Sequence, residues 1–456
     1  MYEDQSRRAF LKRSGALGIV GAASPFAMNL AAIGEAAAAV NSDYKALVCI
    51  FLFGGNDYAN TLPPYDQASY NAYQAQRSAL AYLRSDLAAT ALSPTTPLPG
   101  GRQFALSPSL APLLPVFNAG RMAPVLNVGT LTQPTTKAQY VARSVQLPPK
   151  LFSHNDQQSF WQASSAEGAN SGWGGRIGDL VQSGNGNATL TCINAAGNAV
   201  FLTGRQAVQY AVGTSGPIAL TARTSLYGSA AASSALQTLM AGTNPGLLAN
   251  EHAKISKRSL DAYAQVSTAL TAAPTLTTAF PTSSLGQQLK VVANMISVSS
   301  QLGARRQVFF VSAGGFDLHD SLVAQHPGLL ANVASSAKAF YDATLELGIS
   351  DKVTSFTGSD FGRTLLANTD GSDHGWGSMH FVLGGAVRGK QIYGTPPEYA
   401  NNGPSDVGQG RLLPTISVDQ YASTLASWFG VSDTDMRTVL PNIGNYNSSA
   451  WNLGFI

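Results

Sequence analysis

The chain has 456 residues, of which 12% are charged, and its formal net charge is +3 at pH 7. So small a charge does not suit a protein that binds nucleic acid through a basic face, and we expect no nucleic-acid partner. Beyond residue 39 no run is apolar and long enough to span a bilayer, so we expect no stable membrane span in the mature chain.

The first residues have the order of an export signal. Arg7 and Arg8 precede Phe-Leu-Lys, which resembles the twin-arginine motif. A Gly- and Ala-rich apolar run follows and ends in Ala-Ala-Ala at 37–39, which suits a cleavage site of small residues. The run also contains Pro, Asn and Glu, which disfavours a membrane anchor. We therefore expect residues 1–39 to be a signal peptide for the twin-arginine export machinery. Residues 40–456 would then form a single periplasmic or secreted domain.

Short apolar strands alternate with helical segments along the mature chain. We expect strands at residues 46–53, 122–128, 188–193, 308–311, 353–356 and 380–383. We expect helices at residues 110–118, 153–164, 250–268, 285–296, 330–347 and around 425–429. This alternation predicts an α/β fold with a largely parallel sheet covered on both faces.

The two cysteines, Cys49 and Cys192, both lie in apolar, strand-like surroundings. We interpret them as buried thiols. An oxidising compartment permits a disulfide, which would require the two strands to meet.

Three of the predicted strands are followed by glycine turns and an aspartate, namely Asp57, Asp317 and Asp360. Ligands of open α/β sheets bind at the carboxyl ends of the strands, where these carboxylates would repel one another without a cation. His319 and His374 lie nearby in sequence, and mixed Asp and His ligation suits a divalent metal such as zinc or manganese. The alternative for each aspartate is a helix cap or a turn.

Ser153 and Arg363 are candidates for direct roles in catalysis. Ser153 is expected at the N-cap of a helix and could be a nucleophile if a metal lowers its pKa, or it could only cap the helix. Arg363 follows a strand and could grip a phosphate, sulfate or carboxylate, or form a structural salt bridge. His380 lies in an apolar run and is interpreted as a core or supporting residue, whereas His252 and His326 are expected on the surface.

The chain resembles domain-of-unknown-function family 1501, a family of twin-arginine-exported bacterial proteins related to alkaline phosphatases and sulfatases. The matching segments lie at residues 51–57 (FLFGGND), 106–115 (LSPSLAPLLP), 153–158 (SHNDQQ), 314–320 (GGFDLHD), 359–363 (SDFGR), 373–377 (DHGWG) and 417–422 (SVDQYA). The resemblance implies an alkaline-phosphatase-like three-layer sandwich with a largely parallel central sheet. It also implies a divalent metal cofactor, with zinc, manganese or calcium as the candidates.

The wider superfamily implies roles for individual residues. The expected metal ligands are Asp57, Asp317, His319, Asp360 and His374, and the expected nucleophile is Ser153. The sequence departs from this pattern at Phe361, where the superfamily has a histidine. If no other imidazole replaces it, the site could bind a harder cation such as calcium, bind a single metal, or have lost its activity. His154 and His380 are the two residues that could supply the missing imidazole.

These features predict an exported metal-dependent hydrolase whose substrate is a small anionic ester, either a phosphate or a sulfate. The alternative is a non-catalytic exported envelope or anion-binding protein that retains the hydrolase fold. The departure at Phe361 favours the alternative, and the retained Asp and His residues favour the hydrolase.

Overall fold

The computed structural model describes residues 44–242 and 246–456. The predicted signal peptide at residues 1–39 and its cleavage site lie outside the described residues. Within the described ranges, no helix combines the length and apolarity needed to cross a membrane.

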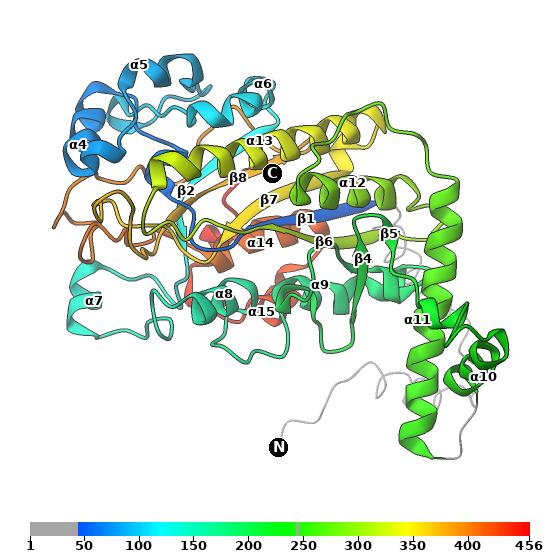
Figure 1. Cartoon of the computed structure of the whole chain (residues 1–456). Coiled ribbons are helices and arrows are strands. Elements are labelled where there is room, and N and C mark those ends of the chain that lie inside the picture. Colours follow the sequence, from blue (N-terminus) through cyan, green and yellow to red (C-terminus); the bar gives the residue numbers. More distant parts are fainter. Residues whose placement is uncertain (1–43, 243–245) are drawn as a thin grey trace, which may run out of the picture. The chain divides into compact units, whose positions relative to one another are not determined.

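A mixed sheet of nine strands forms the centre of the described chain (Figure 1). The strands are β1 (Lys45–Leu52), β2 (Met122–Gly129), β3 (Cys192–Asn194), β4 (Gln209–Gly213), β5 (Gly216–Pro217), β6 (Arg306–Ala313), β7 (Val353–Ser359), β8 (Ser378–Gly384) and β9 (Ile416–Ser417). Their order across the sheet is β5-β4-β3-β6-β1-β7-β8-β2-β9. Strand β1 pairs in parallel with both β6 and β7, and β8 is antiparallel to its neighbours β7 and β2.

Helices cover both faces of the sheet, which makes three layers. Figure 1 shows α12 and α13 on one face and α8, α9, α14 and α15 on the other. The α-helices are α3 (Tyr58–Thr61), α4 (Gln67–Arg77), α5 (Arg84–Leu87), α6 (Leu114–Asn118), α7 (Lys137–Ala142), α8 (His154–Ala163), α9 (Trp173–Val181), α10 (Ala230–Ala241), α11 (Leu247–Thr271), α12 (Ser284–Ser297), α13 (Leu322–Glu346), α14 (Val418–Phe429) and α15 (Asp433–Val439). The predicted three-layer α/β sandwich with a largely parallel central sheet is confirmed.

The central strands are buried on both faces, which explains their continuous apolar sequences. In β1 every residue after Lys45 is buried. Cys49 in β1 and Cys192 in β3 are free, fully buried thiols, as expected. Strand β6 lies between these two strands, so the two cysteines do not face each other across one strand pair.

Two sequence expectations needed correction. The strand expected at residues 188–193 is shorter and begins later, because Ala188–Leu190 forms a 3-10 turn before β3. The helix expected from residue 330 begins at Leu322, and Pro327 lies inside it. Proline inside a helix removes one i→i−4 hydrogen bond and crowds the carbonyl of residue i−4, so Pro327 argued against a helix start before it.

Candidate metal centre

The segments that follow β1, β6 and β7 meet at the same edge of the sheet, because these three strands are adjacent and parallel. Glycine is required where two of the segments touch. Gly54 has φ +115°, and a Cβ atom there would lie 2.4 Å from the backbone nitrogen of Asp317. The absence of a side chain at this position therefore allows the loop after β1 to contact the loop after β6.

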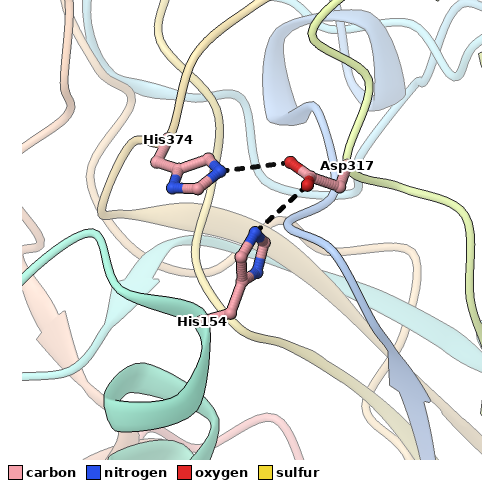
Figure 2. Close-up of side chains that lie close together, drawn as sticks. All are labelled: His154, Asp317 and His374. Carbon is pink, nitrogen blue, oxygen red and sulfur yellow. Dashed lines mark hydrogen bonds and ion pairs between the residues drawn. The ribbon is translucent and has the colours of Figure 1, made fainter.

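Three side chains from distant parts of the chain converge at this edge (Figure 2). His154 is the first residue of α8, Asp317 follows β6, and His374 lies in the loop before β8. One potential ligand atom from each lies within 4.8 Å of the others. His154 Nε2 is 3.3 Å from Asp317 Oδ2, and His374 Nε2 is 3.1 Å from Asp317 Oδ1.

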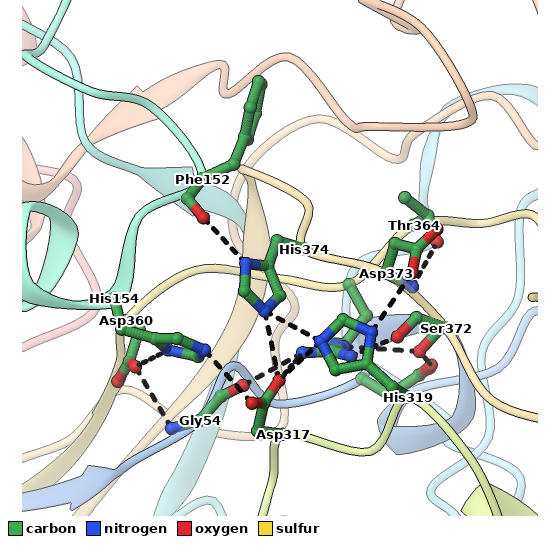
Figure 3. Close-up of polar contacts among 12 residues, drawn as sticks. Gly54, Phe152, His154, Asp317, His319, Asp360, Thr364, Ser372, Asp373 and His374 are labelled. Atoms are coloured by element: carbon green, nitrogen blue, oxygen red, sulfur yellow. Dashed lines mark hydrogen bonds and ion pairs between the residues drawn. The ribbon is translucent and has the colours of Figure 1, made fainter.

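A fourth side chain, His319, borders this group (Figure 3). Its Nε2 atom lies 3.1 Å from Asp317 Oδ1 and 3.0 Å from His374 Nε2. The structure thus brings together three of the sequence-predicted ligands, Asp317, His319 and His374. It adds His154, which the sequence left as an alternative.

The residues of this cluster fit a divalent cation. His154 Nε2 is a buried atom without a hydrogen-bond partner among the described residues, although it faces the Asp317 carboxylate. Burial lowers the pKa of His374, which favours the neutral imidazole that binds metals. Burial opposes ionisation of Asp317, but the hydrogen bond and charge of Arg363 outweigh it and lower the Asp317 pKa. An ionised carboxylate with imidazole nitrogens suits zinc or a similar ion.

Asp360 lies beside the cluster and holds His154. Its Oδ2 atom accepts from Gly54 N at 3.2 Å and from Gln158 Nε2 at 2.8 Å, and lies 2.7 Å from His154 Nδ1. The hydrogen bond to Asp360 raises the pKa of His154. The other carboxylate oxygen, Oδ1, is buried and has no partner among the described residues.

The carboxylate of Asp57 is engaged elsewhere. It forms a salt bridge of 2.7 Å with Arg77. It also accepts a hydrogen bond from the backbone N–H of Asn60, and by this bond Asp57 caps α3. Ser372 Oγ also donates to it, at 3.2 Å. Burial would raise the pKa of Asp57, but the charges of Arg77 and His326 and the hydrogen bonds from Asn60 and Arg77 outweigh it and lower the pKa. The structure therefore places Asp57 at the same sheet edge without bringing its carboxylate into the cluster.

Arg363 is buried and forms a salt bridge with Asp317, at 2.7 Å from Nη1 to Oδ1. Nη1 also donates to the Gly54 carbonyl at 3.1 Å, and the rest of the guanidinium contacts Ser372. The guanidinium is thus held among protein groups, which corresponds to the salt-bridge alternative that the sequence left open.

Ser153 is the N-cap residue of α8, as expected, but its hydroxyl does not cap the helix. Ser153 Oγ donates to Asp156 Oδ2 at 2.9 Å. The next residue, His154, is the one that reaches the cluster. The predicted nucleophile therefore lies beside the site with its hydroxyl bound to another side chain.

Phe361 packs against two imidazoles of the cluster, with ring centroids 4.9 Å from His154 and 4.7 Å from His374.

The expectation that His326 lies on the surface is wrong. It is 1% exposed, and its Nε2 atom lies 3.0 Å from Asn56 Oδ1, because α13 begins earlier than expected and carries it inward. His380 is buried in β8, where burial lowers its pKa to about 3, as expected for a core residue. His252 is exposed, as expected.

Sequence reasoning missed two residues that support the site. Asp373 Oδ1 lies 3.1 Å from His319 Nδ1. Its place directly before His374 was a signal for a supporting role. Arg77 is fully buried and neutralises Asp57, but nothing in its sequence context on α4 indicated this pairing.

The family described as "Protein of unknown function (DUF1501)" matches residues 44–441. The chain belongs to this family. No curated protein matches the chain at a significant level. Similar solved structures include Ps i-CgsB in complex with k-i-k-neocarrahexaose, with 8% identity, a TM-score of 0.34, and coverage of 89% of this chain and 77% of that one. A structure from work on glycosaminoglycan metabolism by Bacteroides thetaiotaomicron has 9% identity and a TM-score of 0.32, with coverage of 86% and 74%.

Proposed function

We propose that this DUF1501 protein is an exported, metal-dependent hydrolase of a phosphate or sulfate ester. The observation that carries the proposal is the convergence of His154, Asp317 and His374 at the carboxyl edge of the sheet. Open α/β sheets bind their ligands at this edge. The substrate would be a small anionic ester, and the compartment would be the periplasm or the extracellular space.

Each residue of the site would have its own role. His154, Asp317 and His374 would hold the cation, and Arg363 would keep the Asp317 carboxylate ionised and fixed in direction. A bound divalent ion would supply stabilisation of the negative charge that develops on the ester oxygens. Phe361 packs against the rings of His154 and His374 and would limit their movement.

The position of Ser153 bears on the attacking group. To act as a nucleophile, its hydroxyl would have to leave Asp156 Oδ2 and turn toward the cluster. Direct attack by water requires no such movement. We therefore propose water as the nucleophile.

A second candidate function is a non-catalytic, exported anion-binding or envelope protein. The observation that favours it is that both residues expected to act directly on the substrate are engaged: Ser153 by Asp156, and Arg363 by Asp317 and Ser372.

One experiment separates these functions. The mature chain is purified, its bound metal is measured by mass spectrometry, and a panel of phosphate and sulfate esters is assayed. Asp317→Asn removes an anionic ligand and should lose both metal and hydrolysis, whereas Asp320→Asn, an exposed neighbour, should keep both. Bound metal without hydrolysis of any ester would favour the second candidate. A chain that binds no divalent metal would overturn the proposal.

A further inference from the structure

A cavity of about 680 Å³ lies at the β4–β5 edge of the sheet, between β4, the segment after β5, α10 and α11. Strand β4 pairs with β5 only over the two residue pairs next to their turn. Beyond this short hairpin, residues 208–211 and 218–220 line the cavity from its two arms, and α11 supplies a further wall. The volume is that of a small-molecule site, for which about 300–1,000 Å³ is usual.

The wall of this edge cavity is mainly apolar and partly open to water. Its large apolar side chains are Val208, Ile218, Leu220, Met240, Ile255 and Leu260. Four of them are exposed, among them Ile218 at 63% and Ile255 at 49%. Exposed apolar side chains that line one concave place indicate a binding groove, because a ligand that covers them removes apolar surface from water.

The edge cavity also contains a positive charge without a counter-charge. In the middle of α11, Lys254 pairs with Glu251 at 3.4 Å and Lys257 pairs with Asp261 at 2.6 Å. Arg258 lines the cavity and forms no salt bridge within the described part of the chain. A guanidinium can bind a carboxylate or a sulfate through two parallel hydrogen bonds. The free charge therefore favours a ligand with an anionic group.

Two tyrosine hydroxyls are further donors in the edge cavity. Tyr210 of β4 and Tyr263 of α11 line it, and neither hydroxyl has a hydrogen-bond partner among the residues that the structure describes. Burial, and to a smaller extent the neighbouring Tyr263, raises the pKa of Tyr210 to about 12. The Tyr210 hydroxyl therefore stays protonated at neutral pH and can donate to an anion.

We propose that the edge cavity binds a small anionic amphiphile, which is an apolar chain or ring system that ends in a carboxylate or a sulfate. The apolar part would cover the aliphatic wall, and the anionic group would bind Arg258. The start of β4 lines the cavity, whereas Asp317 of the metal cluster follows the end of β6. Because β4, β3 and β6 are parallel neighbours, the two sites lie toward opposite edges of the sheet. The inference thus goes beyond the proposed function and requires neither a bound metal nor hydrolysis.

Laurate and dodecanol are the probes, because they have the same chain length and differ in charge. Titration calorimetry of the mature chain should find one saturable site for laurate and weaker binding of dodecanol. Ile255→Glu places a carboxylate in the apolar wall and should weaken laurate binding by about 10-fold or more. A melting curve by circular dichroism checks that the variant is folded. A wild type that does not bind laurate, or a folded variant that binds it normally, would overturn the proposal.

Arg258→Gln tests the recognition of the anionic group. Laurate affinity should fall by about 10-fold or more, the usual effect of losing a hydrogen bond to a charged group, and dodecanol affinity should stay the same. Lys257→Gln is the matched control, because Lys257 is the next residue, is 61% exposed and is paired with Asp261. It should bind both probes like the wild type. Equal losses of laurate and dodecanol in the Arg258 variant would contradict an anionic ligand.

Two other occupants of the edge cavity are distinguished by the same Ile255→Glu variant. Its sedimentation should match that of the wild type, whereas a wild-type dimer that the substitution separates would assign the cavity to a second copy of the chain. Co-sedimentation of the wild type with phosphatidylglycerol vesicles that is lost in the variant, without binding of free laurate, would assign it to a membrane surface. Either of these two results would overturn the proposal.

Discussion

His154 and Asp360 lie 206 positions apart in the chain, and their Nδ1 and Oδ2 atoms are 2.7 Å apart in the structure. The sequence has Phe361 where a histidine next to Asp360 was expected, and two histidines remained as replacements. The structure decides between them. His154 reaches Asp360 from the start of α8, whereas His380 is buried in β8, where its Nδ1 atom lies 3.3 Å from Thr357 Oγ1.

Replacement of His154 should remove metal binding. His154→Ala deletes one imidazole ligand, and we expect zinc affinity to fall by more than about 100-fold, because loss of an outer partner alone costs 10- to 100-fold. Asn155→Ala, at the exposed next position, serves as the control and should bind zinc normally. Competition with a chromogenic chelator measures both affinities. Unchanged affinity in the His154 variant would exclude it from the ligands.

Replacement of Ser153 should affect stability more than activity. Ser153→Ala removes the hydrogen bond to the buried Asp156 carboxylate, which should cost about 1–3 kcal/mol. Hydrolysis should continue, because the proposed nucleophile is water. A melting curve and an ester assay on the same variant test this. Complete loss of turnover with bound metal retained would instead identify Ser153 as the nucleophile.

The buried pair of Asp57 and Arg77 should matter for folding and not for metal binding. Asp57→Asn leaves the buried Arg77 guanidinium without its counter-charge and should reduce the free energy of unfolding by about 3–5 kcal/mol. Since the folded state lowers the pKa of Asp57, its contribution is present above the unfolded value of about 3.9 and is lost as pH falls through the folded value. The variant should therefore lack this acid-dependent loss.

Denaturant unfolding at several pH values measures the effect, and Asp86→Asn, an exposed substitution nearby in sequence, is the control. Zinc binding by folded Asp57→Asn protein should be unchanged. Loss of the ion from that folded variant would contradict the assignment of Asp57 to the protein framework.

Asp419 on α14 should destabilise the protein at neutral pH. Burial raises its pKa from 3.8 to about 6, although the Asn442 N–H and the Ser164 hydroxyl donate to it. Because the folded state raises this pKa, the contribution of Asp419 to stability is fully present below the unfolded value of about 4 and is lost as pH rises through about 6. Asp419→Asn should thus raise the free energy of unfolding above pH 6 by about 3 kcal/mol, at about 1.4 kcal/mol per pH unit.

The measurement is urea unfolding at pH 4 and pH 7.5. The stability difference between variant and wild type should be large at pH 7.5 and small at pH 4. Asp433→Asn, an exposed change at the start of α15, should show no such dependence. A destabilised Asn variant at both pH values would contradict the prediction that ionised Asp419 destabilises the protein.

Export should depend on the arginine pair. Arg7→Lys combined with Arg8→Lys keeps the charge but removes the planar guanidinium groups, and we expect the precursor to accumulate in the cytoplasm. Cell fractionation with immunodetection measures this, and Lys12→Arg in the same segment is the control. An undiminished amount of mature protein outside the cytoplasm would contradict the twin-arginine interpretation.

The sequence alone determined the fold class and the edge of the sheet that carries the site. Continuous apolar runs such as residues 46–53 report burial on both faces, and the glycines and aspartates that follow them mark the strand ends. Because adjacent parallel strands end on the same side, Asp57, Asp317 and Asp360 could be assigned to one edge without a structure.

Only the tertiary structure decided which of these side chains face the cluster. The direction of a carboxylate depends on its nearest partner, and the partners are distant in sequence. Arg77, which is 20 positions further along the chain, binds the Asp57 carboxylate away from the cluster. His154, at the start of α8, lies against the Asp360 carboxylate. Local patterns report the periodicity of burial along one segment, whereas the pairing of a buried charge is set by where separate segments meet.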